Sequence, residues 1–588
     1  MKRKTKQIFR YVSFLLVLLM LFASCGNDQG KETGSTEGGT TAETIDDGVM
    51  PSVFPYALSE FQLVRPDNAS STVTDAAIQL NRTIKEYLGK SLRIKTDFEA
   101  DDEIACEIII GDTTRVQSQE VLATLEAGDY TIQSVKTADG VKIVICGYSD
   151  TLTEKAIAEF EALLQANAVE ESGQIKSFAL KTNLYDLYSD FTLNIGDPIL
   201  VAEGGTYAEL GWGPYQFPKL YYTTSGSILC EWHMSNDQIH GGVTFEGASR
   251  AVSDDGGLTW REATSSDKIS YTRSEMSNGN YFVGFSGQGT HVAEYISKYS
   301  AIYTQSGVSV YYAKTLKELD KTVYARVYNP STGAVTAFEC TINWPYAPIS
   351  VYSGNVVYPI SSTMSISNGL GDLATDDALY FCTYTHGFDL ETGEATKYDK
   401  YYSIYVFKST DNAHTWDCIS RVAVTEEVFN ASKNYKGSFE GFCEPMMSQM
   451  PDGSIVMLMR TGGNQPSYLV RSTDGCQTWS DPVIFDDVGV LPQIITLECG
   501  VSLASYGRDG MYMRATSDHS GLEWEDSIQI PLSKFGSDPK SCYYTYFLAL
   551  DDHTVLWVYS DFYYKTNKTA DATKCVMARI ITVEPKTE

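Results

Sequence analysis

The chain has 588 residues, which is long enough for more than one domain, and its formal net charge at pH 7 is −30. A chain this acidic would repel a phosphate backbone, so nucleic acid is not expected as a partner. With 39 Tyr, 24 Phe and only 20% charged residues, the composition is typical of a β-rich secreted protein with aromatic, sugar-facing surfaces, and not of a helical or disordered chain.

Residues 1–25 are typical of a secretory signal, with basic residues, an apolar run over 12–23 and a small residue before Cys25. This ending resembles a bacterial lipobox, although Phe22 stands where Leu is commoner. The resemblance implies lipid on the Cys25 sulfur, so the protein is expected outside the cytoplasm, anchored by lipid to a bacterial membrane. An ordinary signal peptide or a short membrane anchor is the alternative. Residues 26–50 are rich in Gly, Thr and Glu and predict a flexible linker.

Residues 51–185 mix helical and strand-like patterns and predict a small α+β domain. Apolar residues recur at helical spacing over 77–88 and stop at Gly89, which suits the end of a helix. Strands are expected at 107–111 and 141–145, and the second of these leads into another helix. We see no set of acid, base or metal ligands here. The domain is therefore predicted to be an accessory module, similar to small domains that precede catalytic domains in several glycoside hydrolases.

From residue 186 to residue 588, short strand-like runs alternate with turn signals, and one turn pattern occurs four times. The copies lie at residues 253–260, 409–416, 472–479 and 516–524. In the first copy, a Ser hydroxyl and an Asp carboxylate can accept hydrogen bonds from a tight turn, a Gly supplies positive φ, and Thr-Trp restarts a strand. Four of the eight Trp in the chain end such turns, so the sequence predicts a structural repeat.

The repeated turn resembles the Asp box, also called the BNR repeat, of sialidases and related β-propellers. In that family the box joins the outer two strands of a blade, away from the ligand, so it indicates fold and not activity. The resemblance implies a mainly β fold, a six-bladed β-propeller of sialidase type, over residues 186–588.

No metal site and no cofactor are expected from the cysteines or elsewhere. Eleven Cys remain beside Cys25, and none lies in a CxxC or CxxH spacing. Most lie in apolar strands, Cys146, Cys230 and Cys382 among them, and are predicted to be buried thiols. The oligomeric state stays open.

One segment extends the resemblance to residues that could perform chemistry. The sequence Phe442-Cys443-Glu444-Pro445 precedes Arg460 by one strand, a turn and a second strand. It resembles the sialidase segment in which a Glu acts as base toward a Tyr nucleophile and an Arg belongs to a triad that grips the substrate carboxylate. The resemblance implies that Glu444 is the base and that Arg460 binds substrate. A purely structural ion pair between the two is the alternative.

Two further segments carry the same resemblance. Residues 506–510 resemble the stretch that holds another Arg of the triad, which implies Arg508 as a substrate-binding residue. Residues 543–552 resemble the family's Tyr-Ser-x-Leu strand ahead of a turn, which implies Tyr544 as the nucleophile. Only the register separates Tyr544 from the other tyrosines of this strand.

Two positions in the first blade depart from the family. The family's Tyr-Arg-Ile-Pro segment reads Tyr215-Gln216-Phe217-Pro218 here, so Gln216 replaces the first triad Arg. The acid/base Asp falls on His240, and Asp237, three residues earlier, is the other candidate for the acid. Gln216 keeps hydrogen bonding but loses the charge, so it is expected to bind a neutral ring hydroxyl. A His can donate a proton near neutral pH.

The physical chemistry of these residue types supports a particular reaction. A carboxylate beside the anomeric carbon would repel an Asp or Glu nucleophile, whereas a neutral phenol activated by a Glu can attack. The planar fork of Arg suits a carboxylate. The sequence therefore predicts an exo-acting glycoside hydrolase that releases a terminal acidic sugar, sialic acid or a related one, from extracellular glycans. Two alternatives stay open: a surface glycan-binding propeller without catalysis, and a uronate polysaccharide lyase.

Overall fold

The computed structural model describes most of the chain beyond the N-terminal segment. The described residues are 56–98, 103–171, 174–181, 184–235, 247–287, 300–305, 308–312, 322–352, 356–358, 364, 371–375, 377–531, 543–567 and 569–585. The predicted signal, the lipid site at Cys25 and the linker over 26–50 lie outside them. The chain divides into two compact units, Met1–Asp190 and Phe191–Glu588.

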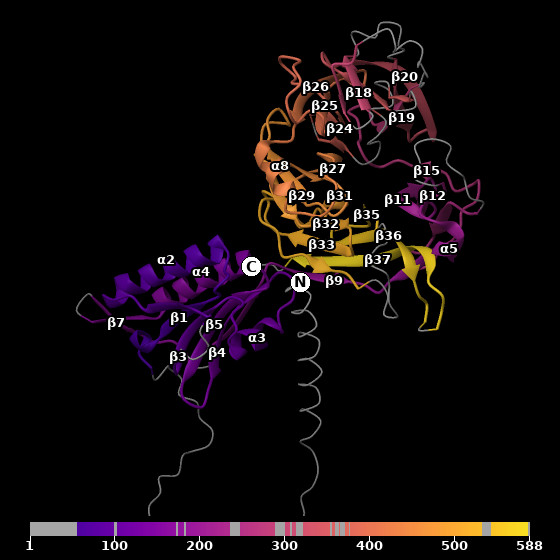
Figure 1. The fold of residues 1–588 in the computed structure, drawn as a ribbon. Coiled ribbons are helices and arrows are strands. Elements are labelled where there is room, and N and C mark those ends of the chain that lie inside the picture. Colours follow the sequence, from indigo (N-terminus) through magenta and orange to yellow (C-terminus); the bar gives the residue numbers. More distant parts are fainter. Residues whose placement is uncertain are drawn as a thin grey trace, which may run out of the picture. The chain divides into compact units, whose positions relative to one another are not determined.

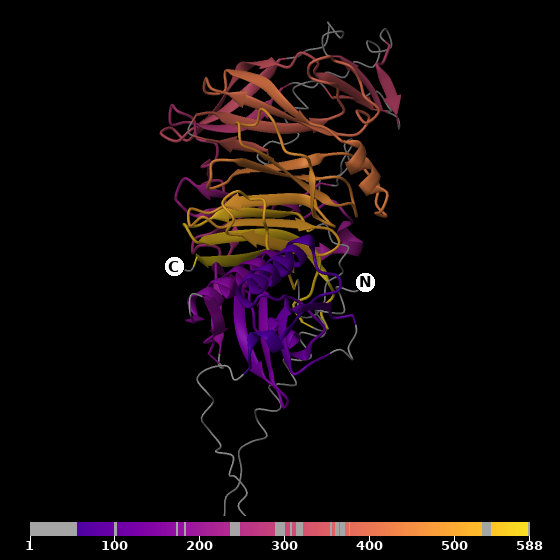
Figure 2. The same ribbon diagram turned by 90° about the vertical axis from the view of Figure 1, so that its left-hand side faces the viewer.

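The first unit is built on a six-stranded sheet with helices on both faces (Figures 1 and 2). The strand order is β2 (Arg93–Thr96), β1 (Gln62–Arg65), β3 (Cys106–Ile110), β5 (Val141–Gly147), β4 (Asp129–Lys136) and β8 (Tyr185–Ser189). Helices α2 (Ser71–Leu88) and α4 (Asp150–Ala166) lie side by side on one face, and α3 (Val116–Leu122) packs on the other. The short elements are η1 (Leu58–Glu60), β6 (Ala168–Glu171) and β7 (Gln174–Phe178).

Local sequence explains where these helices begin and end. The Ser70 hydroxyl accepts a hydrogen bond from the backbone N–H of Val73 at the start of α2, and the helix ends at Gly89 with φ 72°. At the start of α4, the Ser149 hydroxyl accepts in the same way from Leu152. The sheet continues beyond residue 185, where the sequence places the end of the domain, because β8 pairs with β4.

Antiparallel sheets make up most of the second unit, which is mainly β. One sheet contains β10 (Ile199–Thr206), β37 (Thr573–Pro585), β36 (Thr554–Tyr564) and β35 (Thr545–Ala549), with β9 (Phe191–Ile195) paired to β37. A second contains β14 (Arg261–Glu262), β13 (Arg250–Ser253), β12 (Ile228–His233), β11 (Gln216–Thr223) and β15 (Ile269–Ser270). Two more contain β27 (Cys443–Gln449), β28 (Ile455–Arg460), β29 (Ser467–Ser472) and β30 (Val483–Asp486), and β31 (Val490–Thr496), β32 (Ser502–Gly507), β33 (Met511–Thr516) and β34 (Ile528–Gln529).

The rest of this unit is one large sheet and one small sheet. The seven-stranded sheet has the order β16 (Tyr281–Ser286), β19 (Val323–Asn329), β20 (Ala334–Asn343), β26 (Thr415–Val422), β25 (Ser403–Ser409), β24 (Leu379–Thr385) and β23 (Asp372–Ala374). The small sheet contains β17 (Tyr303–Gln305), β18 (Val308–Tyr312), β21 (Pro348–Tyr352) and β22 (Val356–Tyr358). Two short helices are α5 (Tyr207–Leu210) and α8 (Glu426–Ser432).

One strand of each neighbouring sheet lies toward a common centre. β11 contacts β35, β35 contacts β31, β31 contacts β27, and β27 contacts β23 and β24. Figure 1 shows these strands around one central region of the unit. We call β11, β27, β31 and β35 the inner strands. The predicted thiols Cys146, Cys230 and Cys382 are buried and form no disulfide among the described residues.

Three of the four repeated turns join the outer two strands of a sheet, and the second joins β25 to β26 inside the seven-stranded sheet. In the first, Gly257 N–H donates to the Ser253 hydroxyl (2.8 Å), and both the N–H and the hydroxyl of Thr259 donate to the Asp255 carboxylate (2.8 and 2.6 Å). Corresponding bonds tie Ala413 to Ser409, Thr415 to Asp411, Cys476 to Ser472 and Thr478 to Asp474. The sequence repeat is therefore also a repeat of local structure.

Candidate active site

Three inner strands begin with the same irregularity. β11, β27 and β31 each shift in register near their first residues, at the pairs Phe217-Pro218, Glu444-Pro445 and Leu491-Pro492. The residue before each Pro has a positive φ, of 51°, 47° and 46°. A β-bulge re-aims side chains, and Pro is tolerated in it because a bulged residue can leave the ladder of hydrogen bonds. Ahead of β35, Tyr543 also has a positive φ, of 45°.

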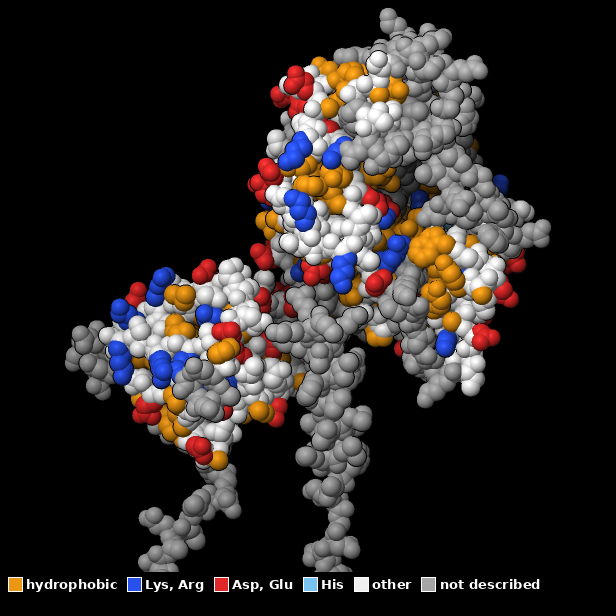
Figure 3. Space-filling model, in the orientation of Figure 1, with side chains coloured by type: hydrophobic (Ala, Val, Ile, Leu, Met, Phe, Trp, Pro, Cys, Tyr) orange, Lys and Arg blue, Asp and Glu red, His pale blue; other side chains and the backbone are white. Residues whose placement is uncertain are grey.

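Direct contacts join these four strand starts into one rim. The rings of Phe217 and Tyr544 stack with centroids 4.2 Å apart and planes inclined by 16°. The backbone N–H of Leu491 donates to Glu444 Oε2 at 2.9 Å. Leu491 and Tyr544 also belong to one buried cluster with Phe562. We call the group formed by Phe217, Glu444, Leu491 and Tyr544 the rim. On the face shown in Figure 3, the surface of the unit is hollowed between the region of β27 and β31 and the region of β11 and β12.

Arg460 ends β28 and forms an ion pair with Glu444. Its Nη1 lies 2.7 Å from Glu444 Oε1, and its Nη2 lies 3.6 Å from Glu440 Oε1. The side chains of Arg460 and Glu444 are only 13% and 14% exposed. Burial works against the charge of Arg460, but Glu444, Cys443, Glu440 and Tyr544 nearby outweigh it and raise the pKa of the guanidinium. The structure thus brings Glu444, Arg460 and Tyr544 together.

Arg508 reaches the same rim from the end of β32. Its guanidinium carbon lies 5.0 Å from the ring centre of Trp212 and 5.8 Å from that of Tyr544. Nε and Nη2 of Arg508, and Nε of Arg460, are buried and have no hydrogen-bond partner within the part of the chain that the structure describes. Unpaired buried donors are costly. Three of them on two arginines beside one tyrosine suit an anionic group.

Gln216 lies at the start of β11, and its Oε1 is buried without a hydrogen-bond partner among the described residues. Gln216 is fully buried, and its Nε2 donates to the backbone oxygen of Trp212 at 2.8 Å. The Lys574 ammonium donates to the same oxygen at 3.0 Å. The bulge that follows turns Phe217, rather than Gln216, toward Tyr544. In this arrangement Gln216 holds the backbone of Trp212, whose ring lies next to Arg508, and its contact with a sugar hydroxyl stays a prediction.

The two candidates for the acid, His240 and Asp237, lie outside the described residues. The strand that precedes them ends at His233, which is exposed and lies at the rim. Its ring meets Phe217 edge-on, with centroids 6.0 Å apart, and its Nε2 lies 2.7 Å from the Ser235 hydroxyl.

Three side chains at the rim were not singled out from the sequence. Trp212 supports Arg508, and Glu440 shares Arg460 with Glu444. Tyr384 of β24 is near the ion pair: burial first, and then Cys443 and Glu444, raise the pKa of its phenol, while Arg460 opposes this. Glu440 could have been suspected from its place four residues before Glu444. Tyr384 has no such signal, because it comes from another sheet.

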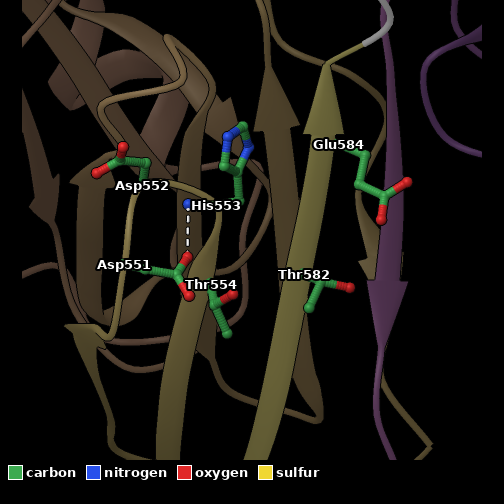
Figure 4. A pocket seen from close by; sticks show the side chains of 6 residues that line it. All are labelled: Asp551, Asp552, His553, Thr554, Thr582 and Glu584. Carbon is green, nitrogen blue, oxygen red and sulfur yellow. Dashed lines mark hydrogen bonds between the residues drawn. The ribbon is translucent and has the colours of Figure 1, made fainter.

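A separate cavity of about 550 Å³ lies at the other end of β35, around the turn into β36 (Figure 4). Its lining residues are Asp551, Asp552, His553, Thr554, Thr582 and Glu584. Asp551 accepts the backbone N–H of His553 at 2.8 Å, as the dashed line shows. Within the described chain, no three His, Cys, Asp or Glu side chains are grouped to hold a metal ion. None of the described helices is long and apolar enough to cross a membrane.

No family model and no curated protein matches the sequence. Among solved structures, a protein of unknown function from Dyadobacter fermentans is 13% identical, with 67% of this chain and 99% of that chain covered and a TM-score of 0.40. The NanB sialidase of Streptococcus pneumoniae is 14% identical, covering 71% and 76%, with a TM-score of 0.31. The GH93 alpha-L-arabinofuranosidase of Fusarium graminearum is 11% identical, covering 66% and 98%, with a TM-score of 0.35. At these TM-scores the reaction has to be inferred from this chain's own side chains.

Proposed function

We propose that the protein is an exo-acting glycoside hydrolase that releases a terminal acidic sugar, sialic acid or a related one, on a six-bladed sialidase-like propeller. In this propeller, each of the four inner strands, and also β16 and β23, would be the innermost strand of one blade, which makes six blades. One observation carries the proposal: Arg460 and Arg508 lie near Tyr544 and the carboxylate of Glu444, and three of their buried nitrogens have no partner among the described residues. These are the groups that binding and attacking a sugar carboxylate requires.

The proposed reaction proceeds in two steps. Arg460 and Arg508 hold the carboxylate of the sugar. The Tyr544 oxygen bonds to the anomeric carbon while the bond to the leaving oxygen breaks; the phenol proton passes to Glu444, and His240 or Asp237 protonates the leaving oxygen. Water then attacks the anomeric carbon and gives its proton back to that acid. The bond to Tyr544 breaks, and the phenol recovers its proton from Glu444.

The setting of this reaction is part of the proposal. The signal and the lipobox-like ending before Cys25 support a place outside the cytoplasm, with the enzyme attached by lipid to a bacterial membrane. The linker over 26–50 would let the folded units reach extracellular glycans.

A second candidate, a glycan-binding propeller without catalysis, is favoured by two observations at the rim. Tyr544 is only 4% exposed and is covered by Phe217, and Gln216 faces the backbone of Trp212. A nucleophile must reach the anomeric carbon, so hydrolysis requires Phe217 to move aside when the sugar binds. Binding alone requires no such movement.

Mass spectrometry of the products separates these possibilities. The soluble protein from residue 50 is incubated with sialylated, ulosonic and uronic-acid glycans, alongside Tyr544→Phe and Glu444→Gln. Tyr281→Phe is the matched control, because the Tyr281 hydroxyl donates to the exposed Glu275 (3.3 Å) and not to any group of the rim among the described residues. We expect one acidic monosaccharide from the wild type and the control, and loss of at least about 100-fold in the other two variants.

Other outcomes contradict the proposal. Unchanged turnover in Tyr544→Phe and Glu444→Gln would exclude the mechanism. Binding without release of sugar would support the binding propeller. An unsaturated product that absorbs in the ultraviolet would identify the lyase.

A further inference from the structure

A cavity of about 310 Å³ lies in the second unit, and Glu444, Arg460, Arg508 and Tyr544 do not line it. Its walls come from β11, β12 and β15 on one side and from β16 and β19 on the other. Asp372 of β23 and Tyr546 of β35 complete the wall. This volume falls within the range of small-ligand pockets, about 300–1,000 Å³.

The cavity is basic in a strongly acidic protein. Four cationic side chains and two carboxylates line it, which gives 4 − 2 = +2, whereas the whole chain has a charge of −30. The residues are Lys219, Arg250, Arg273, Arg326, Glu231 and Asp372. Glu231 accepts a hydrogen bond from Arg250 Nε at 2.6 Å. Lys219 interacts with other residues, but Arg273 and Arg326 still exceed the single negative charge of Asp372, and this excess favours an anionic ligand.

Asp372 adds an acceptor to this basic cavity. Its side chain is 7% exposed, and Oδ2 accepts a hydrogen bond from the Ser274 hydroxyl at 2.7 Å. Oδ1 is buried and has no hydrogen-bond partner among the residues that the structure describes. Because a buried carboxylate oxygen without a donor is costly, the cavity suits a ligand that brings a hydroxyl as well as a negative charge.

Arg273 and the aromatic walls define the remaining surface. Arg273 Nη1 donates to the Tyr546 hydroxyl at 2.8 Å, so its planar head is held in place. The rings of Tyr221 and Tyr271 are half-buried, with centroids 5.8 Å apart and planes inclined by 73°. Rings in this arrangement offer apolar faces next to polar edges, which matches the mixed surface of a sugar.

From the volume, the charge excess, the unpaired acceptor and the tyrosines, we infer that this cavity is a second binding site, separate from the rim, for a sugar carboxylate such as a uronic acid. Arg273 and Arg326 hold the carboxylate, and one sugar hydroxyl donates to Asp372 Oδ1. The sugar ring lies against Tyr221 and Tyr271. A neutral sugar lacks the charge, and acetate lacks the hydroxyl.

Isothermal titration calorimetry with glucuronate tests the site. The full chain is studied in detergent and carries Arg508→Gln, so that binding at the rim is disabled and the proposed hydrolase activity plays no part. In this background we expect glucuronate to bind and glucose not to bind. Adding Arg326→Gln should weaken glucuronate at least about tenfold, the loss of one charge-assisted hydrogen bond. The matched control is Arg261→Gln, because Arg261 lies in the strand after the first repeated turn and pairs with Asp254 and Asp267.

A second variant tests the hydroxyl contact. Asp372→Val removes the acceptor for the sugar hydroxyl, so we expect this variant to bind glucuronate no more tightly than acetate. Thermal melting shows whether each variant folds. If Asp372→Val does not fold, the affinity of Arg326→Gln for glucuronate tests the inference. The inference is wrong if the Arg508→Gln protein does not bind glucuronate, if glucose binds equally, or if Arg326→Gln behaves like Arg261→Gln. Each of these outcomes can occur whether or not the protein hydrolyses glycans.

Discussion

Arg460 and Arg508 lie at the same rim, but Arg460 is paired with a carboxylate and Arg508 lies over aromatic rings. Arg460 is committed to Glu444 at 2.7 Å, so removing it would leave a carboxylate uncompensated and would lower stability as well as function. Arg508 instead lies over the rings of Trp212 and Tyr544, and two of its nitrogens lack partners among the described residues. Arg508 is therefore the better residue for testing substrate binding without disturbing the fold.

The first prediction concerns Arg508→Lys. A lysine keeps the positive charge but loses the planar fork, so only one hydrogen bond to a sugar carboxylate can replace two. We expect KM for the acidic substrate to rise about tenfold with a change in Tm of less than about 2 °C. Steady-state kinetics and thermal melting are the measurements, and Arg261→Lys is the control. An unchanged KM would remove Arg508 from the binding site.

The second prediction concerns His386, which is buried and stacks on Tyr402 with centroids 4.6 Å apart. Burial lowers the pKa of His386 from 6.5 to about 4. Between these values the unfolded chain takes up a proton that the folded protein excludes, so stability falls as pH drops through this window. This proton uptake by the unfolded chain lowers the free energy of unfolding by at most about 3 kcal/mol. In His386→Phe, which keeps the stacked ring, urea unfolding at pH 7 and pH 4.5 should differ less than in the wild type. An equal pH dependence would contradict the assignment.

At the scale of elements, the site depends on how strands begin. Glu444 and Arg460 could be placed from sequence because one strand, a turn and a second strand return the chain to the same end of one sheet. Their contact with Leu491 and Tyr544 joins separate sheets, and no local pattern encodes it. Gln216 shows the limit most clearly. Its position in the motif predicts a substrate contact, whereas its hydrogen bond to Trp212 and the bulge at Phe217-Pro218 could not be predicted from the motif.

The third prediction concerns the repeated turns, which sequence did predict because their bonds are local. The Asp474 carboxylate accepts hydrogen bonds from Thr478, Ser472 and Gln477, and these lower its pKa to about 2. Asp474→Asn should lower the free energy of unfolding by about 1 kcal/mol at pH 7. The wild-type advantage is present above the ordinary Asp pKa, near 3.8, and is lost as pH falls through about 2.

Urea unfolding of Asp474→Asn and Asp481→Asn provides the comparison for this prediction. Asp481 is exposed and lies just beyond the same turn. If both variants lose the same stability, the carboxylate of Asp474 does not hold the turn. Glycan turnover should be unchanged in both, because the turn lies at the outer edge of its sheet.

At the scale of the whole molecule, the chain consists of two units, each with its own hydrophobic core. The α2 and α4 face of the first sheet and the inner-strand clusters of the second unit share no residue. Sequence patterns predict both units, since helical and strand-like periods change along the chain. They place the boundary at 185, because β8 is short and has no strong strand signal, and Tyr185 and Leu187 in it are exposed. Pairing with β4, a distant contact, extends the first unit to Asp190.

The last prediction tests this boundary with three fragments of the first unit. Residues 56–190 should fold cooperatively, whereas residues 56–184 lack β8 and leave the edge of β4 unpaired. We expect the shorter fragment to melt at least about 4 °C lower, the shift that about 1 kcal/mol causes in a domain of this size. Residues 56–195 add β9, which pairs with β37 of the second unit, and should gain nothing over 56–190. Scanning calorimetry gives the three melting temperatures. Equal melting of 56–184 and 56–190 would show that β8 contributes nothing to the first unit, and the boundary would return to residue 185.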